Sequence, residues 1–282
     1  MIPPPDRADI ARHVEAALAE DIGTGDLTAA LIPEDTRLRT AVIAREPAVI
    51  SGRPWFDAVY EALDRSVEIA WDVRDGAKVT ADATLCRVEG PARSVLTGER
   101  AALNFLQLMS GTATVTAEYV AALGGATTKL LDTRKTVPGL RAAQKYAVRC
   151  GGGYNHRLGL HDAMIIKENH IAAAGSIGAA IARAREVAAH RAVAFVEVEV
   201  ETLAELDEAL AAGATRIMLD DFALDDIERA VALTAGRAEL EVSGSVTLET
   251  LPALAATGVD YISVGGLTKH VRAIDLSMRF VD

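Results

Sequence analysis

Residues 196 to 220 read VEVEVETLAELDEALAAGATRIMLD, and this stretch contains the pattern that decides the fold. A short β-type run ends near Glu199, an alanine-rich helical segment follows, and a second β-type run ends at Asp220. A strand followed by a helix, repeated along the chain, predicts parallel strands joined by right-handed crossovers. The other β-type runs end near Asp132, Lys167, Ser243 and Gly265.

The spacing of these runs predicts an α/β protein with an incomplete (β/α) barrel. From Lys167 to Gly265, successive run ends lie 32, 21, 23 and 22 residues apart, close to the length of one strand, one helix and two loops. In barrels of this kind, polar residues at the carboxyl ends of the strands line the active site. An open doubly wound sheet is the structural alternative, because it shares the βα repeat.

The first hundred residues predict a smaller, separate domain of mixed α/β type. A helical face of Ile10, Val14, Ala17 and Leu18 stops at Gly23. Short apolar runs at 41–44 and 48–50 indicate strands, and the stretch 75–93 is typical of a small antiparallel sheet.

A helical pattern begins near Thr97 and extends to Leu123. Within it, Ser110 and Gly111 predict a break between two helices. His13 and His190 fall in amphipathic helical segments, so we expect both at the surface. We expect an N-terminal domain over 1–108, a catalytic barrel over 109–267, and a C-terminal segment over 268–282 that packs back on the N-terminal domain.

Composition argues against several classes of protein. No run of 18 apolar residues occurs, and the stretch from Met1 to Asp9 has three prolines and charges where a secretory segment would be apolar. We therefore expect a soluble, cytoplasmic protein without a membrane partner. The net charge of −11 argues against a nucleic acid as partner. Two cysteines, Cys86 and Cys150, are too few for a disulfide framework.

The positive charge is concentrated in one segment. Residues 129–170 contain eight Lys and Arg against three acids, a net charge of +5 in a chain whose total is −11. A solvated basic face is the simplest explanation of such a segment. A pocket for a small anionic ligand is the alternative, because focused potential matters more there than net charge.

The residues interleaved with these charges favour the pocket and carry a family resemblance. The segment contains DTRKTVPGLR (132–141), KYAVRCGGG (145–153), NHR (155–157) and KENH (167–170). Together with ERAALNFL (99–106), VEVEVE (196–201), IMLD (217–220) and the segments 240–245 and 261–268, they resemble the quinolinate phosphoribosyltransferase family in the expected order.

The resemblance implies transfer of the phosphoribosyl group of 5-phosphoribosyl-1-pyrophosphate to quinolinate, with loss of carbon dioxide. Quinolinate carries two adjacent carboxylates, which suit the planar guanidinium fork of arginine. Arg134, Arg157 and Lys167 are therefore expected to hold it, with Lys135 and His156 beside them. The resemblance also implies that Arg100 enters the site from a neighbouring subunit, which makes a homodimer the smallest functional unit.

The phosphoribosyl substrate needs oxygen ligands for Mg²⁺ and backbone N–H groups for its phosphate. Glu199 and Asp220 are expected to bind Mg²⁺, mainly through substrate and water, and to act with Lys135 and Lys167 as the catalytic residues. Of the alternating Glu197, Glu199 and Glu201, the family motif favours Glu199, and solvation or contact with basic neighbours is expected for the other two. Further substrate contacts are expected from Thr133, from Ser243, Gly244 and Ser245, and from Val264, Gly265 and Gly266.

Three alternatives remain open at this point. A non-decarboxylating phosphoribosyltransferase acting on nicotinate or a similar base would share the phosphate loops. An aldolase would use Lys167 as a Schiff-base nucleophile, and a metabolite-binding protein would release no pyrophosphate. The sequence departs from the family pattern at Glu168, Asp221 and Ser245, which leaves the geometry of the phosphate loop open.

Overall fold

The computed structural model describes residues 6 to 281, so the prolines that weigh against a secretory segment lie outside the described residues. The chain forms two compact units. Among the described residues, the first contains 6–117, 136–152 and 266–281, and the second contains 118–135 and 153–265. The domain boundaries expected after residues 108 and 267 stay predictions.

The first unit is built on a four-stranded antiparallel sheet in the order β12-β1-β5-β3. The C-terminal strand β12 pairs with β1 along its length, from Thr40 opposite Phe280 to Ala44 opposite Leu276. The small antiparallel sheet expected around 75–93 is present. The strands of this unit are β1 (Arg37–Ala44), β2 (Ala48–Val49), β3 (Glu68–Trp71), β4 (Lys78–Val79), β5 (Thr84–Pro91) and β12 (Leu276–Phe280).

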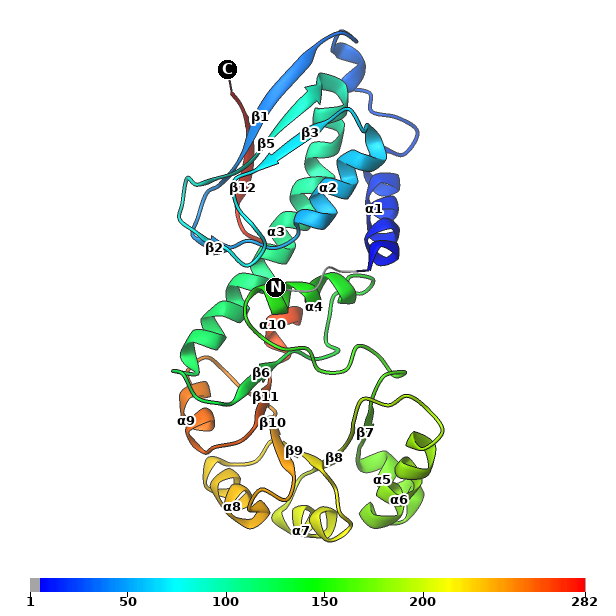
Figure 1. Cartoon of the computed structure of the whole chain (residues 1–282), viewed down its shortest axis with the longest axis vertical. Helices are drawn as coiled ribbons and strands as arrows, with labels where there is room; N and C mark the ends of the chain where they lie inside the picture. Colours follow the sequence, from blue (N-terminus) through cyan, green and yellow to red (C-terminus); the bar gives the residue numbers. More distant parts are fainter. Residues whose placement is uncertain (1–5, 282) are drawn as a thin grey trace. The chain divides into compact units, whose positions relative to one another are not determined.

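Helices pack against one face of this sheet (Figure 1). Val14 of α1, Trp55 of α2 and Val95 of α3 join Val42 and Leu85 of the sheet in one buried apolar core. The first helix begins after Asp6, which caps the N–H of Ala8, and ends at Gly23, as its apolar face predicted. The helices of the unit are α1 (Arg7–Ile22), a 3₁₀ turn (Ala29–Leu31), α2 (Arg53–Leu63), α3 (Ala92–Ala122), α4 (Arg141–Cys150) and α10 (Gly266–Lys269).

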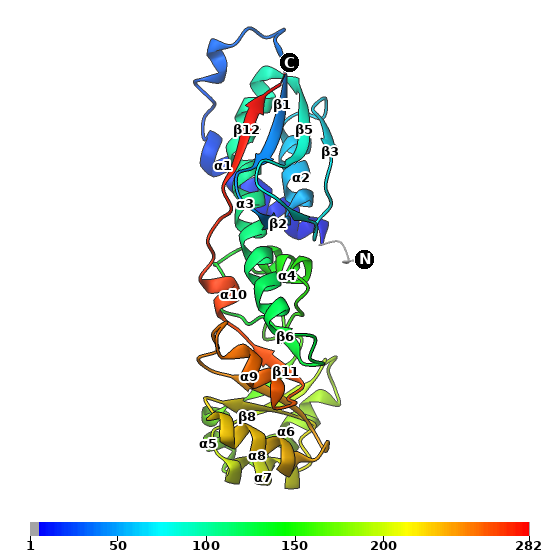
Figure 2. The same cartoon turned by 90° about the vertical axis from the view of Figure 1, so that its left-hand side faces the viewer.

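The predicted break at Ser110 and Gly111 is wrong, because α3 runs unbroken past both residues. Both are buried and serve close packing. The Ser110 hydroxyl accepts a hydrogen bond from the N–H of Ser51 at 3.0 Å. A Cβ on Gly111 would lie 2.1 Å from the carbonyl oxygen of Arg272, so glycine lets the segment before β12 approach the helix (Figure 2).

The second unit confirms the predicted parallel α/β architecture. Its six strands pair in the order β6-β11-β10-β9-β8-β7, and they form an arc with the helices on its outer side (Figure 1). The strands are β6 (Lys129–Leu131), β7 (Met164–Ile166), β8 (Val196–Val200), β9 (Arg216–Asp220), β10 (Glu239–Ser243) and β11 (Tyr261–Ser263). The helices are α5 (Glu168–Ala174), α6 (Ile177–Ala188), α7 (Leu203–Ala211), α8 (Leu224–Thr234) and α9 (Leu251–Ala256).

The arc does not close into a complete barrel. β6 and β7 stand at opposite ends of the strand order, and no ladder joins them within residues 6–281. Apolar side chains such as Val198, Ile217 and Val242 are buried along the strands. Over the same residues, none of the helices is long and apolar enough to span a membrane.

Candidate active site

The residues that were predicted to end the strands, most of them predicted site residues, lie at or directly after the carboxyl ends of the parallel strands. Asp132 comes directly after β6, Lys167 comes directly after β7, and Glu199 is the penultimate residue of β8. Asp220 and Ser243 close β9 and β10 and lie opposite each other in the ladder. Because parallel strands share one carboxyl edge, these side chains gather at the same end of the sheet.

Lys167 and Glu199 form an ion pair between neighbouring strand ends. The Glu199 carboxylate is 7% exposed, whereas the Lys167 side chain is 43% exposed. The lysine is therefore held in place by a nearly buried partner. This pairing disfavours a Schiff-base role for Lys167, because a Schiff-base nucleophile needs its amine nitrogen free to bond to the substrate carbonyl.

The loop after β10 packs against the residue that follows β9. Gly244 has a φ of 112°, and a Cβ at this position would lie 2.1 Å from Asp221 Oδ1. The same oxygen accepts a hydrogen bond from the N–H of Ser245 at 3.3 Å. Asp221, one of the departures from the family pattern, thus helps shape the predicted phosphate loop.

Thr133, Lys135 and Gly265 lie together at the ends of β6 and β11. The Thr133 hydroxyl accepts a hydrogen bond from the N–H of Lys135 at 3.0 Å. A Cβ on Gly265 would lie 2.9 Å from Cδ of Lys135, so glycine here lets the lysine stem pass close to the backbone. This arrangement places a cation beside a glycine loop, a combination suited to phosphate.

Arg134 and Arg157 are close enough to affect each other electrostatically. Burial lowers the pKa of the Arg157 guanidinium below its ordinary value, and the charge of Arg134 lowers it further. The carboxylates of Asp162, Glu197 and Glu199 partly oppose this effect. Two guanidinium groups held near each other form a concentrated positive site at the end of the sheet.

His156 lies inside the unit rather than at an open surface. Its ring Nε2 is 3.0 Å from Glu197 Oε2 and 3.3 Å from Glu241 Oε2. Arg216 bonds to both carboxylates, through Nε to Glu197 at 2.9 Å and through Nη2 to Glu241 at 2.6 Å. We call these four residues, His156, Glu197, Arg216 and Glu241, the buried network. All are at most 10% exposed in their side chains.

The buried network is charge-compensated. Burial alone would favour the neutral imidazole, but hydrogen bonds to Glu197 and Glu241 outweigh it and raise the pKa of His156 to about 9. The N–H of Arg157 is 2.7 Å from Nδ1 and favours a neutral ring. One neutral hydrogen bond contributes less than two charged partners, so the imidazolium prevails at neutral pH.

The buried network resembles a metal site in composition only. The ligand atoms of His156, Glu197 and Glu241 lie within 4.8 Å of one another. However, the guanidinium of Arg216 already bonds to both carboxylates and lies between the rings of Phe195 and Tyr261, 4.3 Å and 4.2 Å from their centroids. A divalent cation would have to displace a well-packed positive group.

Sequence reasoning missed Arg216 and Glu241, and it assigned Glu197 only to solvent or to contact with basic neighbours. Contact with basic neighbours is what the structure shows for Glu197. A signal was present: strands buried on both faces usually read as continuous apolar runs. Here the runs 196–200, 216–220 and 239–243 each carry two charged residues, spaced two or four positions apart and therefore on one face of the strand. Glu201 lies beyond β8 and is exposed.

The remaining predicted site residues differ in their placement. Arg100 is exposed on α3 and belongs to the first unit, as does Gly266 at the start of α10. Val264 is buried, and its N–H donates to the carbonyl of Leu131 at 2.9 Å, so it supports the loop from within.

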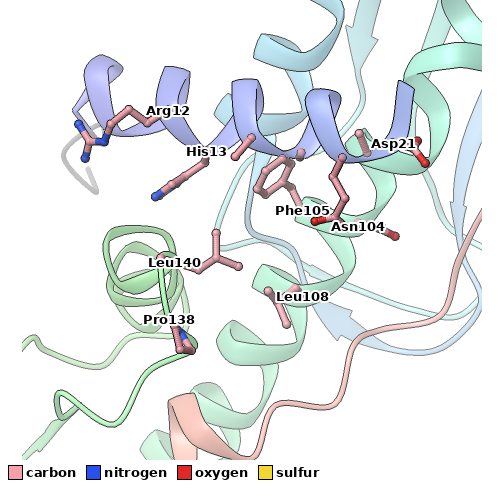
Figure 3. A pocket seen from close by; sticks show the side chains of 13 residues that line it. Arg12, His13, Asp21, Asn104, Phe105, Leu108, Pro138 and Leu140 are labelled. Atoms are coloured by element: carbon pink, nitrogen blue, oxygen red, sulfur yellow. The ribbon is translucent and has the colours of Figure 1, made fainter. Parts of the chain in front are cut away.

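The first unit has a cavity of its own, of about 710 Å³, lined by α1, α3 and residues 138–140 (Figure 3). His13 on its wall is half-buried and hydrogen-bonded, whereas we expected it at the surface. Its Nδ1 accepts a hydrogen bond from Trp55 Nε1 at 3.0 Å, and burial lowers its pKa. Arg12, Glu20 and Asp21 give the lining mixed charge, so the stronger candidate for an active site is the strand-end cluster of the second unit.

The sequence matches known proteins over most of its length. Models of the N-terminal and C-terminal domains of quinolinate phosphoribosyl transferase match residues 26–110 and 112–279. A probable carboxylating nicotinate-nucleotide pyrophosphorylase of Bacillus subtilis is 44% identical over 92% of this chain and 89% of its own length. A decarboxylating quinolinate phosphoribosyltransferase of Nicotiana tabacum is 40% identical over 96% of this chain and 82% of its own length.

The solved structures extend the match to the fold. The nicotinate-nucleotide pyrophosphorylase of Francisella tularensis superposes with a TM-score of 0.95 and 47% identity, covering 100% of this chain and 99% of that one. Family models, curated relatives and fold agree over nearly the whole sequence, and they confirm the resemblance carried by the motifs. The chain belongs to the quinolinate phosphoribosyltransferase family.

Proposed function

We propose that this protein is a decarboxylating quinolinate phosphoribosyltransferase, which converts quinolinate and 5-phosphoribosyl-1-pyrophosphate to nicotinate mononucleotide, pyrophosphate and carbon dioxide in de novo NAD biosynthesis. One observation carries the proposal most strongly: cations, carboxylates and a glycine loop converge at one end of a parallel sheet in a chain of this family. Each group matches one part of the two substrates.

Quinolinate would bind through its two carboxylates. Arg134 and Arg157 lie close enough to influence each other, and planar guanidinium groups bind carboxylates through paired hydrogen bonds. Lys167 adds a third positive charge, and Glu199 restrains its position. A dicarboxylate complements the charge of such a cluster better than nicotinate does, because a single carboxylate would leave part of the positive charge without a partner.

The phosphoribosyl substrate would bind at the ends of β6, β10 and β11. Lys135 beside Gly265 suits the pyrophosphate, and the loop of Ser243, Gly244 and Ser245 offers backbone N–H groups. For Mg²⁺ the donor chemistry fits, since Glu199 and Asp220 present the carboxylate oxygens that this ion prefers. When bound, Mg²⁺ would neutralise charge on the pyrophosphate.

The chemistry then requires positioning more than a protein nucleophile. The pyridine nitrogen attacks the anomeric carbon as pyrophosphate departs, and the carboxylates of Glu199 and Asp220 stabilise the positive charge that develops on the ribose. The ring nitrogen becomes cationic once it is bonded to ribose. Its positive charge stabilises the carbanion that forms on the adjacent ring carbon when the carboxylate departs as carbon dioxide, and that carbon then takes up a proton from water to give nicotinate mononucleotide.

The proposed function also includes a homodimer, in which Arg100 of one copy would contribute to the active site of the other. This residue is exposed on α3, one turn before Asn104, whose side chain lines the cavity of the first unit (Figure 3). Glu20 and Asp21 add negative charge at the same cavity, which complements the basic strand ends of a second copy. Arg100 would then reach the partner's quinolinate.

The direct test is to incubate the purified chain with quinolinate, 5-phosphoribosyl-1-pyrophosphate and Mg²⁺ and to follow all three products. Equal yields of nicotinate mononucleotide, pyrophosphate and carbon dioxide are expected. Pyrophosphate release with nicotinate and none with quinolinate would support the non-decarboxylating alternative and overturn the proposal.

A further inference from the structure

The segment that carries Arg157 crosses the open side of the arc. β6 and β7 are not joined by a ladder within residues 6–281, and the last backbone pairing before Arg157 is at Tyr154, which forms an isolated bridge with Leu131. Strand pairing therefore does not determine where Arg157 lies. Contacts of neighbouring side chains must do so.

Side chains hold this segment on both sides of Arg157. The carboxylate of Asp132 accepts hydrogen bonds from Asn155 Nδ2 at 2.6 Å and from the N–H of His156 at 2.9 Å. After Arg157, the carboxylate of Asp162 accepts the N–H of Leu158 at 2.7 Å. The imidazole between these two anchors points inward to the buried network.

We infer that the buried network is a positioning device for Arg157, and that His156 acts on quinolinate through Arg157 instead of touching it. The inference rests on the proposed function and refines it. It reassigns His156, which the sequence placed among the substrate contacts, to a supporting role. It also gives Glu197, Arg216 and Glu241 a part in substrate recognition although they lie inside the sheet.

The ring atoms of His156 are already engaged by the protein. Nε2 lies against two carboxylates, Nδ1 is 2.7 Å from the N–H of Arg157, and the side chain is 5% exposed. The ring also packs edge-on against Phe195, with centroids 5.2 Å apart. By contrast, Arg157 Nε is buried without a hydrogen-bond partner among residues 6–281, so it retains donor capacity for a carboxylate.

Positioning is needed because Arg134 and Arg157 repel each other before the substrate arrives. A flexible segment would let the two guanidinium groups separate, and quinolinate would then have to bring them together at a cost in affinity. A segment fixed by Asp132 and by side chains of three strands of the arc keeps both charges in place. Such preorganisation is what makes a charged site effective.

The test uses a matched pair of substitutions on one strand. Glu241→Gln removes a buried anion of the network, and Glu239→Gln changes an exposed residue two positions earlier on β10. We expect Glu241→Gln to raise the KM for quinolinate about tenfold while changing the KM for 5-phosphoribosyl-1-pyrophosphate less than twofold. Glu239→Gln should leave both constants unchanged.

A double-mutant cycle separates positioning from a general structural effect. If Glu241 acts through Arg157, then Glu241→Gln should add no further change in the background of Arg157→Ala. Multiplying effects would overturn the inference while leaving the proposed function intact. No turnover of quinolinate by the wild-type chain would instead overturn the proposed function.

Thermal unfolding would show whether the Glu241→Gln variant folds. If it does not fold, a second variant still tests the inference. Phe195→Leu removes the ring that packs on His156 and Arg216 but leaves every charge of the network in place. We expect the same selective rise in the KM for quinolinate. An equal rise in both KM values would contradict a role in positioning Arg157.

Discussion

At the level of single residues, Lys167 shows how the site prepares its charge. Its ammonium group is paired with Glu199 before any substrate binds, so it is already in place. Lys167→Ala should lower kcat/KM with quinolinate by a factor on the order of 10² to 10³. Arg229→Ala, which removes an exposed arginine of α8, is the control and should keep full activity. Near-normal turnover by Lys167→Ala in steady-state assays would remove Lys167 from the site.

Protonation of His156 should make the free energy of unfolding decrease as the pH becomes alkaline. Its folded-state pKa of about 9 lies above the ordinary value of 6.5, so the native state retains the proton more strongly than the unfolded chain. This contribution is fully present below pH 6.5 and is lost as the pH rises through about 9. Its size is on the order of 3 kcal/mol.

Urea unfolding between pH 6 and pH 10 would measure this effect. The difference in unfolding free energy between the wild type and His156→Gln should shrink as the pH rises, because only the wild type carries the imidazolium. His190→Gln changes an exposed histidine and serves as the control. A difference that stays constant over this range would show that His156 is not charged in the native state.

Some residue roles could not be predicted from the sequence. Glu197, Glu199 and Glu201 alternate identically, yet Glu197 contacts His156 and Arg216, Glu199 pairs with Lys167, and Glu201 is exposed. Alternation predicts which face of a strand a side chain occupies. It does not predict which residue each side chain contacts, because the contacting residues come from segments far apart in the sequence.

At the level of elements, Gly111 decides whether α3 and the segment before β12 fit together. The Cβ of Gly111→Ala would meet the carbonyl oxygen of Arg272, and backbone cannot move aside cheaply. We expect this variant to lose about 1 to 3 kcal/mol in unfolding free energy. Gly178→Ala in α6 should be neutral or stabilising, because its Cβ would reach only Ala212 at 3.9 Å. Equal stability of the two variants by urea unfolding would contradict this packing account.

The elements themselves were largely predictable where local pattern and tertiary contact agree. The β-type runs ending near Glu199, Asp220 and Ser243 became strands ending within one residue of those positions. The predicted break at Ser110 and Gly111 failed, because glycine also serves close approach between segments. That approach involves Arg272, far along the chain, so no local pattern could reveal it.

At the level of the whole molecule, the proposed homodimer makes each active site depend on two copies of the chain. Arg100→Ala and Lys167→Ala should each be nearly inactive alone. Mixing them after reversible dissociation should restore about a quarter of the wild-type activity, because random pairing gives half mixed dimers with one intact site each. No recovery, although mixed dimers form, would indicate that Arg100 and Lys167 serve the same chain.

The central claim is that decarboxylation of quinolinate follows its attachment to ribose. The most direct measurement uses quinolinate labelled in the carboxylate adjacent to the ring nitrogen and follows labelled carbon dioxide with and without 5-phosphoribosyl-1-pyrophosphate. We predict labelled carbon dioxide only when both substrates are present, in an amount equal to the pyrophosphate released. Pyrophosphate release without labelled carbon dioxide, or carbon dioxide from quinolinate alone, would contradict the account.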